Sequence, residues 1–374
     1  MMSPEESITL IEANIAEVLH SEIIDDVVLN KRRPLRVYWG TATTGKLHCG
    51  CFVPIVKIAE LLKAGCHVKI LLADIHAYMD NMKAPFELIA YRCEYYRFLI
   101  QSMLRSIGID ISTAKLEFVV GSSYQWDKEY TIDSRRLEAI TKLSAAKKAG
   151  AQALDEEYLD VDAQLGGVDQ RKIFTFASEA LPKLGYKKRA HLMNTMVPGL
   201  GDAEKMSSSE PNSKIDILDT SEMVEKKLRK AVCIPKRAEG NGLIAFVGHV
   251  IFRVASIKLG KPRFVIEQSN GVPLVYEDIR MLEKDFEQDV VTPQMIKAAL
   301  TKTLYQLLEP IRRDFRASEE WQRVSALGYP PEEERKSSWT KVERRKSMSR
   351  RVPTMTATPC LNEQELSGSK IPGQ

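Results

Sequence analysis

The sequence predicts an α/β fold: a Rossmann-like, doubly wound parallel sheet in a first domain, followed by a smaller, mainly helical C-terminal domain. Two observations support this. In roughly the first 200 residues, short apolar runs alternate with longer segments of helical spacing, which is typical of βαβ units. From about Thr220 the chain becomes Lys-rich and helical in pattern, with few strand candidates.

The expected elements of the first domain alternate along the chain. A helix should open at the N-terminus, where Ser3, Pro4 and Glu6 have the pattern of an N-cap, a first-turn proline and a capping-box glutamate. The apolar runs suit parallel strands buried on both faces. In chain order we expect a helix over 8–30, a strand over 35–40, a helix over about 50–64, a strand over 68–73, a helix over 85–107, a strand over 116–120, helices over 130–149 and 174–181, and an extended segment over 191–197.

The second domain and the C-terminal segment differ in composition. Residues 243–258 and 293–315 have helical spacing, and the apolar periodicity stops after Tyr329-Pro330-Pro331. Residues 335–351 hold eight Lys or Arg and one Glu, which is typical of a basic, disordered segment. Such a tail suits a phosphate backbone, and a solvated tail without a partner is the alternative. We therefore expect domains over residues 1–218 and 219–318 and a tail over 319–374.

Composition limits the class of protein. Hydrophobic residues make up 44% and charged residues 28% of the chain, so a fibre or wholesale disorder is excluded. A net charge of +4 permits a polyanionic partner without requiring one. The six cysteines show neither a disulfide framework nor paired zinc spacing, so we expect reduced thiols in the cytosol and no metal site. The longest apolar runs are strand-sized, far below the roughly 20 residues that cross a bilayer, so we expect no membrane anchor.

One polar segment, Thr43-Thr44-Gly45-Lys46-Leu47-His48-Cys49-Gly50, lies between a predicted strand and a predicted helix. In open α/β folds this edge of the sheet binds ligands, and a helix N-terminus favours phosphate. Thr43 and His48 add donors, and Gly50 has no side chain, so a flat ring can lie against the backbone. The alternative is a polar turn with a capping histidine.

Two further segments combine polar groups with Gly or Ser. Lys205-Met206-Ser207-Ser208-Ser209 lies between the two domains, where a loop lysine can stabilise a departing pyrophosphate. Gln152-Ala153-Leu154-Asp155 precedes Gly166-Gly167-Val168-Asp169-Gln170, whose glycines permit close ligand approach and whose side chains offer hydrogen bonds. Taken singly, a solvated linker lysine and a helix-capping turn are the alternatives.

In this order the three segments resemble the class I aminoacyl-tRNA synthetases, whose two signatures stand here as His48-Cys49-Gly50-Cys51 and Lys205-Met206-Ser207-Ser208-Ser209. The resemblance narrows to the eukaryotic, fungal-type cytosolic tyrosyl-tRNA synthetases, and it is dense from about 30 to 220 and thinner to about 318. The segments that narrow it are 37–42, 72–78, 152–158, 166–174 and 191–200.

The resemblance implies a ligase that activates tyrosine with ATP and Mg²⁺ to tyrosyl-adenylate and pyrophosphate. Tyrosine is then transferred to tRNA(Tyr), in the cytoplasm and typically by a homodimer. Activation needs no general base, because the substrate carboxylate attacks in line and catalysis consists of positioning and charge stabilisation.

The resemblance also implies a role for each matching residue. Tyr38 and Asp155 would bracket the phenol hydroxyl of the substrate, and Gln152 and Gln170 would hold its amino-acid head. Within the ATP site, Asp169 and Gly167 would meet the ribose and Gly50 would lie under adenine. The ATP-binding set would be Gly40, Gly50, Gly167, Asp169 and Lys205, and the catalytic set Thr43, His48, Lys205 and Ser208.

This chain departs from the family at the start of the Gln152 segment. A family segment of roughly twenty residues, several helical turns, is absent, so that Ala151 directly precedes Gln152. The absent piece includes a tyrosine that holds the substrate ammonium, and a hydrogen bond to a charged group contributes about 1.5–3 kcal/mol. We therefore expect weaker tyrosine binding.

The positions that read the anticodon in the family also differ. Fungal relatives carry an aromatic residue before a Gly-Gly pair and an Asp just after a proline, whereas this chain has Glu267-Gln268-Ser269-Asn270-Gly271 and Thr292-Pro293-Gln294-Met295. Stacking and carboxylate contacts to a base are thereby altered. Two alternatives follow: a diverged paralogue that activates tyrosine for another acceptor, and a non-catalytic RNA-binding or regulatory form.

Overall fold

The structure is a computed structural model that describes residues 2–79, 86–199, 214–268 and 271–331. Residues 1–329 form one compact unit, and residues 330–374 form a second. The first unit contains both the sheet and the C-terminal helices, so a boundary near residue 218 stays a prediction.

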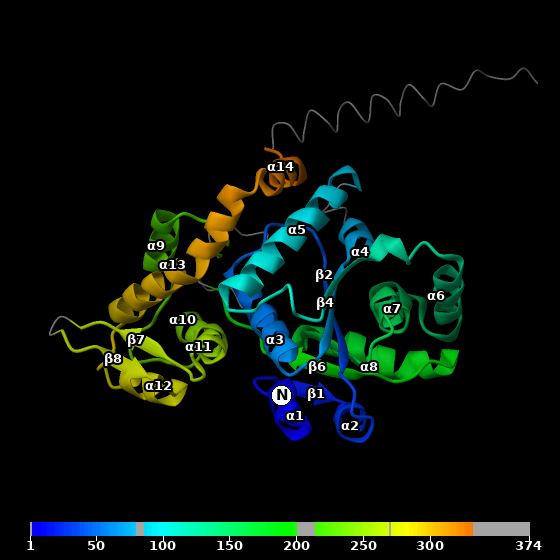
Figure 1. Cartoon of the computed structure of the whole chain (residues 1–374), viewed down its shortest axis with the longest axis horizontal. Coiled ribbons are helices and arrows are strands. Elements are labelled where there is room, and N and C mark those ends of the chain that lie inside the picture. The colour runs from blue at the N-terminus through cyan, green and yellow to red at the C-terminus, as the bar shows by residue number, and fades with distance from the viewer. Residues whose placement is uncertain (1, 80–85, 200–213, 269–270, 332–374) are drawn as a thin grey trace, which may run out of the picture. The chain divides into compact units, whose positions relative to one another are not determined.

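A six-stranded sheet forms the centre of the compact unit, in the order β1-β6-β5-β2-β3-β4 (Figure 1). Strands β2 to β6 are parallel, and only the short edge strand β1 is antiparallel to its neighbour β6. The predicted α/β class is confirmed, with a mixed rather than wholly parallel sheet. The strands are β1 (Glu17–Leu19), β2 (Arg36–Thr41), β3 (His67–Leu72), β4 (Leu116–Val120), β5 (Ala163–Gly167) and β6 (Ala190–Asn194).

Helices cover both faces of the sheet, with α3 and α5 on one side and α6, α7 and α8 on the other (Figure 1). This follows from the strand order, since the chain leaves β2 toward β3 and β4 and then crosses back to β5. The helices of this part are α1 (Pro4–Glu12), α2 (Ser21–Asp25), α3 (Phe52–Lys63), α4 (Asp74–Met79), α5 (Phe86–Ser106), α6 (Lys128–Ile140), α7 (Leu143–Tyr158) and α8 (Arg171–Ala180). Single helical turns are η1 (Asp26–Asn30), η2 (Cys49–Cys51), η3 (Gly121–Ser123), η4 (Val168–Gln170) and η5 (Leu181–Leu184).

The C-terminal part is mainly helical, as predicted, and adds one two-stranded hairpin. Its helices are α9 (Ser221–Lys230), α10 (Gly242–Phe246), η6 (Val247–Ile251), α11 (Phe252–Leu259), α12 (Ile279–Glu287), α13 (Pro293–Ala317) and α14 (Glu319–Gly328), and its strands are β7 (Phe264–Ile266) and β8 (Leu274–Tyr276).

The N-terminal capping box is present as expected. Ser3 Oγ accepts a hydrogen bond from the Glu6 N–H at 3.1 Å, and the Glu6 carboxylate accepts one from the Ser3 N–H at 2.7 Å. The helix does not continue over 8–30, however, because Asn14 and His20 adopt left-handed backbone angles, with φ of 57° and 59°. Residues 17–19 between them pair with β6 instead.

Two other predicted elements are corrected. The helix expected over 130–149 is two helices, α6 and α7, separated where Thr141 takes an extended conformation with φ −131° and ψ 170°. Strand β5 was not among the expected strands, because Gln164 and the two glycines interrupt its apolar pattern. It is nevertheless central, pairing with both β2 and β6.

A buried ion cluster joins α1, α3 and α11. Lys57 donates hydrogen bonds to the Leu10 and Ala13 carbonyls at 2.9 and 2.7 Å and to Glu60 at 3.2 Å. The Arg253 guanidinium donates to both oxygens of Glu60, at 2.8 and 2.7 Å. Burial, the largest cause, lowers the pKa of Lys57 to about 8. Such a cluster holds its elements together only while every charge keeps its partners.

The stretch Gly242–Leu259 is long and apolar enough to cross a membrane, and it is one such helix among the residues described. Of this stretch, 61% is buried inside the protein, as in the core helix of a globular protein. One such helix is therefore only weak evidence for a membrane span. Arg253, which pairs with Glu60, lies within it.

The start of the predicted tail is corrected by α14. Trp321, only 1% exposed, stacks on Phe98 with ring centroids 5.9 Å apart. Arg92 on α5 donates to the Gly328 carbonyl at 2.9 Å and to the Thr44 carbonyl at 2.6 Å. Residues 319–329 are therefore ordered because they bury an aromatic anchor, while the basic stretch 335–351 lies outside the described residues.

Replacing Arg253 by Met should lower the free energy of unfolding by about 3 kcal/mol, because it leaves part of the Glu60 charge buried without its partner. Chemical denaturation would measure this. The matched control is Arg280→Met, which breaks an ion pair to Asp278 whose arginine side chain is 83% exposed. That control should leave the stability nearly unchanged, and equal losses in the two variants would contradict the role given to the cluster.

Candidate active site

Two cavities lie at the carboxyl end of β2, and successive residues of this strand line them in turn. Tyr38 and Gly40 line the first, which we call the Tyr38 cavity, and Trp39 lines the second, the Gly50 cavity. Because side chains alternate along a strand, the two cavities lie on opposite faces of the sheet.

The Tyr38 cavity has a volume of about 400 Å³. It brings together all four residues predicted to bind tyrosine, namely Tyr38, Gln152, Asp155 and Gln170, and also Gly40 from the predicted ATP set. Other elements complete its walls, with His76 and Met79 from α4, Trp126 after β4, and Ser134, Leu137 and Glu138 from α6. The sequence grouping of these residues is therefore confirmed as a spatial one, while their roles stay predictions.

Asp155 is buried at the side of this cavity and already engaged. Its Oδ1 accepts hydrogen bonds from Tyr124 Oη at 2.7 Å, Gln125 Nε2 at 2.8 Å and Tyr130 Oη at 3.2 Å. Burial raises the pKa of Asp155 to about 6, although these three donors oppose the shift. The donors favour the charged form and burial disfavours it, so the carboxylate ionises only near neutral pH.

Tyr38, Gln152 and Gln170 are linked to one another. The Tyr38 hydroxyl donates to the main-chain carbonyl of Gln152 at 3.0 Å, and Gln152 Nε2 donates to Gln170 Oε1 at 3.0 Å. A side chain at Gly166 would clash with Gln170 Oε1 and Phe174, so only glycine lets Gln170 reach this position. The phenol and amide groups thus satisfy one another, and a ligand has to replace those bonds.

Helix α7 runs unbroken through the junction of Ala151 and Gln152. Gln152 and Asp155 both face the Tyr38 cavity, as expected for residues three apart on one helix. Gly150 and Ala151 line the same cavity, at the place where the family's additional segment would begin. The shortened wall is therefore made by small residues that carry no hydrogen-bonding side chain.

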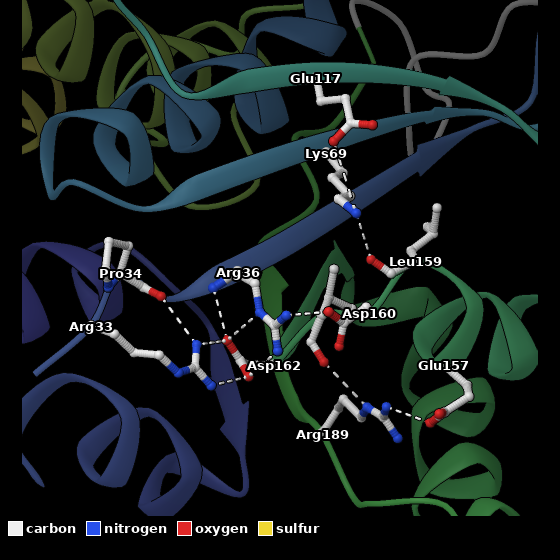
Figure 2. Close-up of polar contacts among 11 residues, drawn as sticks. Arg33, Pro34, Arg36, Lys69, Glu117, Glu157, Leu159, Asp160, Asp162 and Arg189 are labelled. Carbon is white, nitrogen blue, oxygen red and sulfur yellow. Dashed lines mark hydrogen bonds and ion pairs between the residues drawn. The ribbon is translucent and has the colours of Figure 1, made fainter. Parts of the chain in front are cut away.

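The C-terminal end of α7 is fixed to the sheet by basic side chains (Figure 2). Arg33 makes a two-pronged ion pair with Asp162, with both N–O distances 2.7 Å. Lys69 on β3 donates to the Leu159 carbonyl at 2.8 Å, and Arg189 pairs with Glu157 at 2.6 Å. Because these contacts follow directly after Asp155, they hold the end of the helix that carries it.

The Gly50 cavity is smaller, about 170 Å³, and contains three of the predicted nucleotide-site residues: His48, Gly50 and Gly167. The backbone around His48 is held by the segment that follows the second signature, since the Cys49 N–H donates to the Ile215 carbonyl at 2.8 Å. Burial, helped by the charge of Lys214, lowers the pKa of His48 to about 4. The imidazole is therefore neutral at pH 7 and presents one donor and one acceptor.

Not every predicted site residue reaches these cavities. Thr43 is fully buried, its hydroxyl accepts a hydrogen bond from Cys93 Sγ at 3.8 Å, and it lines neither cavity, so its role stays a prediction. Asp169 is exposed in η4 beside Gly167 and lines neither cavity. Lys205 and Ser208 lie outside the described residues.

Besides the wall residues already named, the sequence analysis missed five residues that bear on the polar groups of these sites. Tyr124, Gln125 and Tyr130 surround Asp155, Lys214 influences His48, and Asn194 lines the Gly50 cavity. Tyr124 and Asn194 could have been found, because both stand at or just beyond the carboxyl end of a parallel strand.

A family described as class I tRNA synthetases (W and Y) matches residues 30–151 and 149–309 of this chain. The chain therefore belongs to the class I tRNA synthetases of the tryptophan and tyrosine branch. The two matched stretches meet at residues 149–151, the place where the sequence analysis expects a family segment to be missing.

Its relatives include cytoplasmic tyrosine–tRNA ligases, so the expected resemblance to the cytosolic tyrosyl-tRNA synthetases is confirmed. The enzyme of Saccharomyces cerevisiae is 45% identical over 380 residues, covering 96% of this chain and 95% of its own. That of Xenopus tropicalis is 49% identical over 350 residues, covering 88% of this chain but only 64% of its own.

Solved structures agree in fold. Tyrosyl-tRNA synthetase of Archaeoglobus fulgidus, crystallised with L-tyrosine, is 32% identical with a TM-score of 0.73 and covers 84% of this chain and 99% of its own. The Pyrococcus horikoshii enzyme, also crystallised with L-tyrosine, is 26% identical with a TM-score of 0.77. The match covers 86% of this chain and 99% of that one.

The raised pKa of Asp155 predicts a pH effect on stability. The folded state binds this proton more tightly than the unfolded chain, so the contribution is fully present below about pH 4 and is lost as the pH rises through about 6. Compared with Asp155→Asn, which does not titrate, the parent should lose about 2–3 kcal/mol between pH 4 and pH 7. Denaturant titrations at both pH values would measure this, and identical pH dependence in the two proteins would contradict it.

Proposed function

We propose that this chain is a tyrosine–tRNA ligase, which joins tyrosine to ATP as tyrosyl-adenylate and then transfers it to tRNA(Tyr) in the cytoplasm. The observation that carries the proposal is that Tyr38, Gln152, Asp155 and Gln170 line one cavity. A second cavity with His48, Gly50 and Gly167 opens at the end of the same strand, in a chain of this family.

In the activation step the tyrosine carboxylate attacks the α-phosphate of ATP, the new C–O–P bond forms, and pyrophosphate leaves. No residue has to remove a proton, so the site works by positioning and charge stabilisation. His48 is neutral at pH 7 and can donate one hydrogen bond to a phosphate oxygen without adding charge. Lys205 of the second signature, assisted by Ser208, would supply the positive charge that stabilises the departing pyrophosphate.

Tyrosine is selected over phenylalanine through the polar end of the Tyr38 cavity. The phenol hydroxyl would enter between Tyr38 and Asp155, whose groups currently bond to Gln152, Tyr124, Gln125 and Tyr130. Phenylalanine cannot restore the bonds that it displaces, and a site of this kind therefore rejects it strongly.

ATP would bind on the side of the Gly50 cavity, with Mg²⁺ carried by its phosphates. Among the described residues there is no group of three or more His, Cys, Asp or Glu placed to hold a metal. Phosphate oxygens and water are ordinary ligands for Mg²⁺ in such a site.

The tRNA would contact the C-terminal helical part at a third cavity of about 390 Å³, the Phe264 cavity. Glu267 and Met295, which belong to the two segments that differ from the family's anticodon-reading positions, both line it, and Lys302 forms an ion pair with Glu267 there. A carboxylate is therefore retained in the cavity that Met295 lines, although it comes from the residue after β7 rather than from α13.

A second copy of the chain would cover exposed apolar side chains beside the Tyr38 cavity. Met79 and Trp126 are 60% and 64% exposed and both line that cavity, and Phe86 packs edge-on against Tyr78. Large apolar side chains gathered at the surface are typical of a protein interface. A homodimer is therefore part of the proposal.

The absent segment also favours a second candidate, a paralogue that activates tyrosine but charges another acceptor. In a third candidate, a non-catalytic RNA-binding form, activation itself would be lost. Tyrosine-dependent ATP–pyrophosphate exchange separates the first two from the third, and charging of tRNA(Tyr) separates the first from the second.

Asp155→Ala should reduce the preference for tyrosine over phenylalanine in ATP–pyrophosphate exchange by at least about tenfold, equivalent to 1.4 kcal/mol. The ratio of kcat/KM for the two amino acids is the measurement. Asp133→Ala is a suitable control, because Asp133 is a buried carboxylate that accepts hydrogen bonds from Tyr158 and Tyr186 and does not line the cavity. Unchanged selectivity in Asp155→Ala would show that another group reads the hydroxyl.

Inserting the family's segment from a close relative between Ala151 and Gln152 should raise the affinity for tyrosine at least about tenfold. The reason is that the segment returns the tyrosine that holds the substrate ammonium, while Gln152 and Asp155 stay on α7. Calorimetry of both proteins with tyrosine would measure the change. Equal affinities would mean that the short wall formed by Gly150 and Ala151 does not weaken the site.

A further inference from the structure

Helix α6 brings a carboxylate to the Tyr38 cavity that has no role in the function proposed above. Four residues of this helix line the cavity, and their spacing places them on one face of the helix: Tyr130, Ser134, Leu137 and Glu138. The Glu138 side chain is 31% exposed. Because it lines the cavity and is also partly exposed, Glu138 lies at the rim, where the cavity opens to solvent.

The charges around the cavity favour a cationic ligand group. Among the described residues that line it, the carboxylates are Asp155 and Glu138, and there is no lysine or arginine. Asp155 already accepts hydrogen bonds from three donors. Glu138 has one ion pair, at 2.7 Å, with Arg135, whose side chain is 74% exposed. Acidic groups without basic ones attract a ligand that carries positive charge.

The ion pair with Arg135 leaves Glu138 able to bind such a ligand. Exposed ion pairs are weak, because water screens the charges and two long side chains lose conformational freedom. A carboxylate also has about four lone-pair sites, so it can accept from an arginine and from a second cation at once.

The two carboxylates lie at separate positions along the cavity. Tyr130, in the first turn of α6, donates to Asp155 at 3.2 Å. Glu138 follows about two turns later on the same helix, a rise of about 11 Å. Tyrosine likewise carries its hydroxyl and its ammonium at opposite ends of a flat ring. With the hydroxyl at Asp155, the ammonium would point toward the side of the cavity where Glu138 lies.

The other groups near the amino-acid head do not balance the charge of an ammonium. Gly150 and Ala151 line the cavity and have no polar side chain. Gln152 and Gln170 are neutral amides that are bonded to each other at 3.0 Å. Amides can orient an ammonium group, but taking a charge out of water is costly unless an opposite charge is present. Glu138 is the lining carboxylate that can supply it.

We propose that Glu138 binds the α-ammonium group of the amino-acid substrate through a charge-assisted hydrogen bond. The inference rests on the proposed use of tyrosine and deepens it, because it names the group that balances the positive charge of the substrate. The same glutamate repels the substrate carboxylate and turns it away from α6. One side chain thereby holds and orients the amino-acid head.

The test compares tyrosine with two analogues, tyramine, which lacks the carboxylate, and 3-(4-hydroxyphenyl)propanoate, which lacks the ammonium. Isothermal calorimetry without ATP measures binding alone. Glu138→Gln removes the charge and keeps the shape, so it should bind tyrosine and tyramine about tenfold more weakly than the parent does. Its affinity for 3-(4-hydroxyphenyl)propanoate should not fall, because that ligand has no ammonium to lose.

Glu129→Gln is the matched control. Glu129 lies on the same helix, is exposed and does not line the cavity. This variant removes the same charge from the protein and should leave all three affinities as they are in the parent. Equal losses in the two variants would show that only the overall charge matters, and would overturn the proposal.

Two further results would overturn it. One is an unchanged affinity for tyrosine in Glu138→Gln. The other is an equal loss for tyrosine and for 3-(4-hydroxyphenyl)propanoate, since this would show that the substitution alters the shape of the cavity and not the recognition of the ammonium.

Tyrosine-dependent ATP–pyrophosphate exchange separates this inference from the proposed function. Exchange by the parent, with the same KM for tyrosine in Glu138→Gln, would support the function and refute the inference. Absence of exchange by the parent, together with the tenfold loss of tyramine binding in Glu138→Gln, would refute the function and support the inference.

Discussion

Strand β2 is the constraint on which the rest of the structure depends. It is hydrogen-bonded to β3 on one side and β5 on the other, at the point where the order of the sheet reverses. The pleat then assigns Tyr38 to one face and Trp39 to the other. A slip of one residue would exchange the two side chains, so the pairing register of this strand fixes which face takes which ligand.

Helix α7 shows how such a site can tolerate a large change in chain length. Its C-terminal end is held by Arg189 and Lys69, and Arg33 holds Asp162 in the loop that follows; none of these contacts involves the N-terminal half of the helix. The residues before Gln152 can therefore differ while Asp155 keeps its place. What changes is the wall of the cavity, because Gly150 and Ala151 offer no polar side chain there.

Much of this arrangement could be predicted from the sequence, and the parts that could not have physical reasons. Strand 116–120 and the helix after Pro85 have strong periodicity, and the structure reproduces them closely. Strand β5 lacks such periodicity, because Gln164, Gly166 and Gly167 give its sequence the appearance of a turn. The sequence grouped Tyr38 with Asp155, yet the donors around Asp155 come from a strand end and a helix that no local pattern connects to it. Thr43 has a residue type suited to phosphate, but its burial against Cys93 depends on the packing of α5.

The contacts at the end of α14 have a consequence for how the protein is made. The Tyr329 hydroxyl donates to the Gly45 carbonyl at 3.1 Å, across 284 residues of chain. Arg92 donates hydrogen bonds to the carbonyls of the neighbouring residues Thr44 and Gly328, and so joins the same two segments. A ribosome adds roughly 5–20 residues per second, so the turn before His48 waits roughly 15–60 s for its last partner. The turn before His48 is therefore completed only after α14 has been made, although His48 and Gly50 themselves are made long before that helix.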